Sequence, residues 1–138
     1  MHPPPLSMLA VGIFATGAII GYLVGLNASQ KVHASNAFVL LVGLTFTSAV
    51  DKSVFKTMFS VYAEYIERNE PTTLSYSIAD SDKDPNCVVI IERYKDKDAY
   101  LKIHKISPQF LEFRSKMAAM DISIDGHSYF ETDIGFLS

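Results

Sequence analysis

The hydrophobic pattern between residues 38 and 136 changes in one definite order: strand, helix, strand, strand, helix, strand. Strands are indicated where apolar residues alternate or run continuously, and helices where they recur every three or four positions. This order predicts an α+β fold, a ferredoxin-like split βαβ sandwich with one antiparallel sheet and both helices on one of its faces. The predicted strands are 38–46, 73–79, 87–94 and 122–136.

Local signals mark the first helix and the hairpin that follows it. Ser48 followed by Asp51 resembles a capping box and predicts the start of the helix. The sequence Asn69-Glu70-Pro71 ends it, because a residue before proline disfavours helical backbone. Residues 80–86 form a polar turn, so we expect the strands on either side of it to pair as a hairpin.

The second helical region is predicted in two parts. Residues 96–104 form the first part, and Ser107-Pro108 then restarts the helix as an N-cap followed by proline at the first helical position. In the last strand, Gly126 predicts a bend.

The predicted strands contain more apolar residues than a sheet with one solvent-exposed face would have. Residues 38–46 and 88–91 are apolar on both sides of the strand, whereas an antiparallel sheet with one solvated face alternates apolar and polar residues. A second copy related by two-fold symmetry would cover that face. We therefore expect a homodimer that packs sheet to sheet.

A separate apolar segment precedes this domain. Residues 3–30 carry no charged side chain, and residues 6–26 are apolar or small apart from Ser7, Thr16 and Tyr22. Such a run is long enough to cross ~30 Å of hydrocarbon as a helix. We predict a single-pass membrane anchor within a tail of residues 1–34, followed by a soluble domain at 35–138.

The alternative for this segment is a cleaved signal peptide, with Val32-His33-Ala34 as the cleavage site. No Lys or Arg precedes the apolar run, and the run exceeds the usual length of a signal-peptide core, so a retained anchor is favoured. Lys31 lies on its C-terminal side and indicates a cytoplasmic soluble domain. The spacing of Gly17, Gly21 and Gly25 would allow two such helices to approach closely, or simply reflect the frequency of glycine in membrane helices.

The net charge and the positions of the histidine and cysteine residues argue against nucleic-acid binding and metal binding. The chain has a formal net charge of −3 with no basic tract, so nucleic acid is not an expected partner. His2, His33, His104 and His127 are scattered and Cys87 is the only cysteine, so no short cluster of metal ligands exists.

The stretch from Glu92 to His104 concentrates side chains suited to an oxidisable aromatic substrate. To activate a phenolic substrate, a site must accept the phenolic proton and stabilise the anion. His104 is the candidate proton acceptor, since an unperturbed imidazole has a pKa of ~6.5. Tyr94 and Tyr100 are candidate hydrogen-bond donors or pocket-lining residues, and Arg114 a candidate source of fixed positive charge.

Each of these residues also has an ordinary structural role. A histidine near a helix break is commonly a C-terminal cap or a packing residue. Tyr94 and Tyr100 suit the ends of a strand and a helix face, where amphipathic aromatic residues are common. Arg114 would be solvated or ion-paired, and Glu92 would orient a neighbour or form an ion pair in the sheet.

An ordered set of short motifs runs through the domain: Glu70-Pro71, Leu74-Ser75-Tyr76, Asp84-Pro85, Glu92-Arg93-Tyr94, Asp98-Ala99-Tyr100 with His104, and Ser107 with Phe110 and Phe113. With these spacings, residues 38–136 resemble the antibiotic biosynthesis monooxygenase (ABM) domain family. The resemblance implies a dimeric α+β barrel of ferredoxin-like subunits. Members include cofactor-independent oxygenases of polycyclic phenols, quinol oxygenases, haem-degrading enzymes and an isomerase of a signalling molecule.

The chain departs from the haem-degrading members in two places. The tryptophan that many members carry after the strand glutamate is Tyr94 here, and residues 38–46 contain no asparagine. Both departures argue against haem as the substrate.

The sequence therefore predicts a membrane-anchored monooxygenase that uses molecular oxygen, without a cofactor, on a hydrophobic quinol or phenol. His104, Tyr94 and Tyr100 are the predicted catalytic residues, and Arg114, Tyr76 and Phe113 the predicted substrate-binding residues. Two alternatives stay open. One is a non-catalytic dimeric binding or scaffold module of the same fold, and the other is an isomerase of a small polar metabolite.

Overall fold

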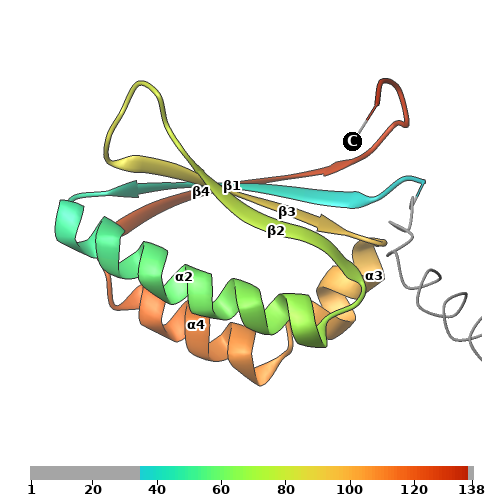
Figure 1. The fold of residues 1–138 in the computed structure, drawn as a ribbon, viewed down its shortest axis with the longest axis horizontal. Helices are drawn as coiled ribbons and strands as arrows, with labels where there is room; N and C mark the ends of the chain where they lie inside the picture. The colour runs from blue at the N-terminus through green and yellow to red at the C-terminus, as the bar shows by residue number, and fades with distance from the viewer. Residues whose placement is uncertain (1–34, 137–138) are drawn as a thin grey trace, which may run out of the picture. The chain divides into compact units, whose positions relative to one another are not determined.

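The computed structural model describes residues 35–136, which form a four-stranded antiparallel sheet with the strand order β2-β3-β1-β4. Figure 1 shows α2 and α4 side by side beneath one face of this sheet. The α+β ferredoxin-like fold expected from the order of elements is confirmed. The elements are β1 (Phe38–Phe46), α2 (Ala49–Asn69), β2 (Thr73–Asp80), β3 (Cys87–Tyr94), α3 (Lys97–Ala99), η2 (Tyr100–His104), α4 (Pro108–Ala118) and β4 (Ile122–Phe130).

The main core lies between the sheet and the two long helices. β3 shows how the strands contribute to it, because its residues alternate between fully and partly buried positions along the strand. Aromatic rings from the strands and from both helices meet in this core. Its buried members are Leu44, Phe46, Phe55, Phe59, Tyr62, Ile66, Val88, Ile90, Phe113 and Met117.

Helix α2 begins as the sequence predicts. The Ser48 side-chain oxygen accepts hydrogen bonds from the backbone N–H groups of Val50 and Asp51, at 3.1 and 3.3 Å. These N–H groups belong to the first turn, which has no carbonyl partners within the helix. At the other end, the Glu70 N–H donates to the Ile66 carbonyl, at 2.8 Å, and the helix stops before proline.

Removal of this cap gives a direct stability prediction. Ser48→Ala should lower the free energy of unfolding by about 1 kcal/mol, because two backbone donors lose their acceptor. Ser53→Ala, in the exposed part of the same helix, should leave stability unchanged or raise it slightly, because alanine has the higher helix propensity. Urea unfolding followed by circular dichroism measures both, and equal effects of the two substitutions would contradict the capping role.

The second helical region is more broken than the sequence indicates. After the short α3, residues Tyr100–His104 form a turn of π-helix, in which the Lys105 N–H donates to the Tyr100 carbonyl at 2.8 Å. Such turns insert one extra residue per turn and occur frequently at functional sites. The chain then restarts at Ser107, which caps Phe110, and at Pro108, as predicted.

The last strand is shorter than expected. Its pairing with β1 runs without a shift past Gly126, which lies opposite Val42, so no bulge interrupts the strand there. The strand ends at Phe130 rather than Phe136. Asp133 and Gly135 have φ values of 58° and 105°, a left-handed backbone that leaves the extended path of a strand.

The face of the sheet opposite α2 and α4 has no helix against it within residues 35–136 (Figure 1). Val39, Leu41, Val89 and Ile91 alternate with core residues along β1 and β3, so they lie on this face, and each is half-buried. The apolar character of the open face agrees with the sequence argument for a second copy. The homodimer itself stays a prediction.

The predicted membrane anchor at residues 6–26 lies outside the described residues, as does the whole predicted tail of residues 1–34. Among residues 35–136, no helix has both the length and the apolar character needed to cross a bilayer.

Candidate active site between the sheet and the helices

His104, at the end of η2, is a fully buried ionisable side chain. Its Nδ1 atom lies 2.8 Å from Oε2 of Glu70, the residue that caps the C-terminal end of α2. Their exposed fractions are 0% and 4%. The Thr73 hydroxyl, at the start of β2, donates to the same Glu70 oxygen at 3.0 Å. Three elements therefore converge on one imidazole–carboxylate pair.

Aromatic rings surround His104 on several sides. The distances from its ring centroid to theirs lie between 4.9 Å, for Phe110, and 6.2 Å, for Tyr100. Each ring comes from a different element, so folding of the whole domain is needed to build the cluster. These rings are Tyr62 of α2, Tyr76 of β2, Tyr94 of β3, Tyr100 of η2 and Phe110 of α4.

A second buried carboxylate lies in the same layer. Glu92 and Tyr94 are two residues apart on β3 and point to the same side, where the Tyr94 hydroxyl donates to Glu92 Oε2 at 2.6 Å. Burial raises the pKa of the Glu92 carboxyl and outweighs the opposing hydrogen bond. Burial and the Glu92 charge likewise raise the pKa of Tyr94. The Tyr94 hydroxyl therefore stays protonated and is already committed to Glu92.

The other tyrosines of the cluster also stay protonated. Burial raises the pKa of Tyr62, Tyr76 and Tyr100, with neighbouring carboxylates adding to each effect. They are hydrogen-bond donors at any physiological pH. The tyrosines are therefore not proton acceptors in this site.

The raised pKa of Glu92 predicts a pH-dependent gain in stability for Glu92→Gln. The folded protein favours the protonated carboxyl, so the ionised form costs stability above the folded-state pKa, and this cost vanishes as the pH falls below the ordinary value of 4.5. Glutamine keeps an acceptor for Tyr94 without the charge. The variant should therefore be more stable than the wild type at pH 7, and equally stable below about pH 4.5.

Urea unfolding at a series of pH values checks this expectation. Glu112→Gln is the matched control, because Glu112 is exposed and pairs with Lys116, which lowers its pKa. That control should gain nothing at pH 7. A Glu92→Gln variant less stable than the wild type at neutral pH would overturn the assignment of a destabilising buried charge.

The structure brings the predicted catalytic residues together. The ring centroids of Tyr94 and Tyr100 are 5.4 Å apart, and that of His104 lies 5.2 Å from Tyr94. Tyr76 joins the cluster, at 5.6 Å from His104. The three predicted catalytic residues and one predicted substrate-binding residue thus share one site.

The other two predicted substrate-binding residues lie further out. Phe113 stacks on Tyr62 in the main core, with ring centroids 4.6 Å apart. Arg114 is exposed on α4. Its positive charge opposes part of the rise in the pKa of Glu92 and Tyr100, so it acts within the site's electrostatic range.

Sequence reasoning missed Glu70, which it treated as part of a helix stop. The signal was an acidic residue placed between a helix end and a strand start, within the Glu70-Pro71 motif.

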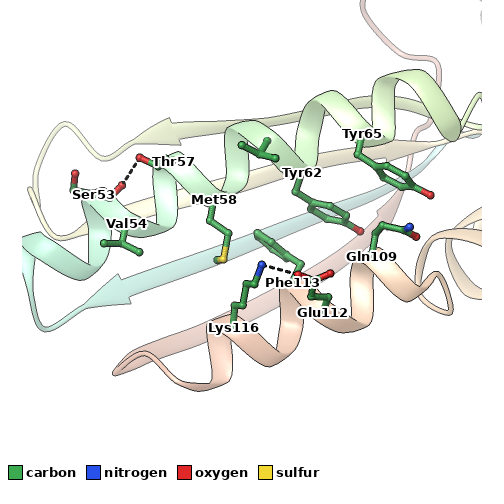
Figure 2. A pocket seen from close by; sticks show the side chains of 11 residues that line it. Ser53, Val54, Thr57, Met58, Tyr62, Tyr65, Gln109, Glu112, Phe113 and Lys116 are labelled. Carbon is green, nitrogen blue, oxygen red and sulfur yellow. Dashed lines mark hydrogen bonds and ion pairs between the residues drawn. The ribbon is translucent and has the colours of Figure 1, made fainter.

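Two grooves flank the cluster on the outside of α2. One, of about 700 Å³, runs between α2 and α4 and is lined by Val54, Met58, Tyr62, Tyr65 and Phe113, among others. Figure 2 shows these side chains from both helices facing the groove. The other, of about 560 Å³, lies between α2 and β2 and includes Tyr76.

Neither groove is lined by His104 itself. Tyr62 lines the first groove and Tyr76 the second, and both rings contact His104. These two rings therefore separate the imidazole from the grooves. Among residues 35–136, no group of three His, Cys, Asp or Glu side chains stands close enough to hold a metal ion.

Residues 49–116 match the family model described as antibiotic biosynthesis monooxygenase (ABM). This match supports the resemblance to ABM domains that the sequence motifs indicate. The match contains Glu70, Glu92, Tyr94, Tyr100 and His104, so the site lies within the part of the chain that the family model covers. No curated protein matches the sequence significantly.

Several solved structures share this fold. SnoaB, a cofactor-independent oxygenase from Streptomyces nogalater, superposes in its N63A mutant form with a TM-score of 0.62 at 16% identity, over 72% of this chain and 96% of SnoaB. A protein from Nitrosomonas europaea, provisionally designated an antibiotic biosynthesis monooxygenase, gives 0.62 at 22% identity, over 72% and 95%. A conserved protein from Methanosarcina mazei gives 0.60 at 18% identity, over 70% and 94%. At these identities the likeness shows the fold alone, and the fold carries more than one function.

Proposed function

We propose that this protein is a membrane-anchored, cofactor-independent monooxygenase that acts on a hydrophobic quinol or phenol. The observation that carries the proposal is the buried His104, paired with a carboxylate and ringed by tyrosines within the region that matches the ABM family model. The cofactor-independent activity stated for SnoaB, which shares the fold, supports the same chemistry.

The reaction balances without an external reductant. A hydroquinone and one O₂ give a hydroxyquinone and one water, so the substrate supplies all four electrons that reduce the oxygen. One oxygen atom enters the product and the other leaves as water. The protein has to remove a phenolic proton, hold the anion and keep out bulk water.

Each step has a candidate residue. His104 accepts the proton through its free nitrogen, Nε2. Tyr100 and Tyr76 keep their protons and can donate hydrogen bonds to the oxyanion. Arg114 adds positive charge within electrostatic range, and Phe113 belongs to the apolar wall of the α2–α4 groove. Substrate entry requires movement of the Tyr62 or Tyr76 ring, since these rings separate His104 from the grooves.

The anchor and the dimer complete the proposal. An anchor at residues 6–26 would hold the domain, on the cytoplasmic side, where lipid-soluble quinols are concentrated. A second copy against the half-buried apolar face of β1 and β3 would exclude water from that side of the sheet.

Oxygen uptake by the full-length protein over a panel of hydroquinones and phenols tests the activity. We expect turnover above the buffer rate, rising with the hydrophobicity of the substrate. Uptake no faster than in buffer for every compound would refute the proposal. That result would favour a non-catalytic binding module, a function that also fits the separation of His104 from both grooves by Tyr62 and Tyr76.

A further inference from the structure

We propose that Glu70 is a positioning residue: it keeps a proton on Nδ1 of His104 and so directs all proton exchange of this imidazole through Nε2. The catalytic consequence rests on the proposed function. The placement of the proton rests on the geometry alone.

The partner of Nδ1 decides which nitrogen carries the proton. Oε2 of Glu70 already accepts a hydrogen bond from the Thr73 hydroxyl, so we assign Nδ1, 2.8 Å from the same oxygen, as the donor. The hydrogen bond made by one ring nitrogen sets the state of the other. Neutral His104 therefore has Nδ1–H and a lone pair on Nε2.

Glu70 is itself held in place. Its Oε2 atom accepts a second hydrogen bond, from the Thr73 hydroxyl at 3.0 Å, and its backbone N–H closes the last turn of α2. Pro71 follows and fixes the path of the chain. A carboxylate held by both its side chain and its backbone can determine the orientation of the ring that it contacts.

The second ring nitrogen of His104 makes no hydrogen bond within the described part of the chain. Nε2 of His104 is buried and without a hydrogen-bond partner among residues 35–136. A buried polar atom left unpaired is destabilising, so such atoms are rare unless a ligand or water meets them. Nε2 is the nitrogen that Glu70 leaves free, which is where a substrate hydroxyl would donate its proton.

The surroundings of the pair contain other titratable groups, and none competes for Nδ1. Tyr62 faces the imidazole from α2, Tyr76 from β2, Tyr94 from β3 and Tyr100 from η2, all as protonated phenols. Glu92 is engaged by the Tyr94 hydroxyl. Glu70 is the group bonded to the ring.

Nitrogen-15 NMR of the full-length protein tests the proposal without any turnover. The shifts and couplings of His104, assigned by comparison with His104→Gln, identify which nitrogen is protonated. We expect the neutral imidazole to carry its proton on Nδ1. A neutral His104 with its proton on Nε2 would overturn the assignment.

Variants separate positioning from mere support of the fold. In Glu70→Ala, neutral His104 should lose its preference for Nδ1–H, and kcat should fall about 10- to 100-fold with KM little changed, because only proton transfer is impaired. Glu70→Gln retains an acceptor oxygen and should restore most of the Nδ1–H tautomer. Asp82→Ala, which removes an exposed carboxylate from the turn between β2 and β3, should change neither.

The two proposals fail separately. If His104 has Nδ1–H and the protein consumes no oxygen, the role of Glu70 stands and the oxygenase proposal falls. If oxygen is consumed and the tautomer is the opposite one, Glu70 is not the positioning residue. If Glu70→Ala does not fold, the tautomer of the wild-type protein alone decides.

Discussion

His104→Ala should lower quinol-dependent oxygen uptake by at least about 100-fold, because general base catalysis by a positioned side chain contributes roughly 10²- to 10⁴-fold. The surrounding tyrosines have raised pKa values and keep their protons. No neighbouring hydroxyl can therefore replace the imidazole as a base. The loss should appear in kcat and in kcat/KM alike.

The control for this variant is His127→Ala. His127 lies on β4, and its side chain is 59% exposed beside Asp125. It offers the same chemical change away from the buried cluster and should retain full activity. Circular dichroism confirms that both variants are folded. A folded His104→Ala protein with wild-type turnover would refute the assigned mechanism, although not the fold.

Phe55→Ala should lower the free energy of unfolding by about 3–5 kcal/mol, the largest stability loss expected for a single substitution in this domain. Phe55 has no exposed surface, and its ring contacts Phe46, Phe59 and Phe113 with centroid distances of 5.3 to 6.0 Å. It joins β1 to both helices. Its removal leaves a cavity at the centre of the core that those rings cannot easily fill.

Phe136→Ala is the matched control, because Phe136 is 95% exposed. The same truncation there should change stability by no more than about 0.5 kcal/mol. Urea unfolding followed by circular dichroism measures both variants. A loss below about 1 kcal/mol for Phe55→Ala would contradict the placement of this residue in the core.

The regular parts of the fold could be read from the sequence because the signals are local. β1 and β3 begin and end at the predicted residues, since each strand is a short apolar run bounded by turn residues. The capped starts of α2 and α4 followed from Ser48 and from Ser107-Pro108 for the same reason.

The irregular parts could not be read in the same way. The helical pattern continues through residues 100–104, and nothing in it reveals the extra residue of a π-turn. Ile134 and Phe136 extend an alternating pattern beyond Phe130. They are 90% and 95% exposed because Asp133 and Gly135 take left-handed backbone conformations.

The sequence predicted the site residues that lie close together along the chain, and it missed the partner of His104 that lies far away in sequence. Tyr94, Tyr100 and His104 lie within one short stretch, so their proximity could be predicted. Glu70 lies 34 positions before His104, and the two meet only because β2 and β3 form a hairpin between them. Pairing across such a distance depends on topology, which spacing alone does not give.

Incorporation of isotopic oxygen tests the central claim most directly. The full-length protein, treated with a chelator, is supplied with ¹⁸O₂ and a hydrophobic hydroquinone, and the product is analysed by mass spectrometry. The proposed reaction predicts a hydroxyquinone that carries one ¹⁸O atom, formed at the same rate before and after chelation, and lost in His104→Ala. A product without label, or no product beyond the buffer reaction, would contradict the assignment of this domain as a cofactor-independent monooxygenase.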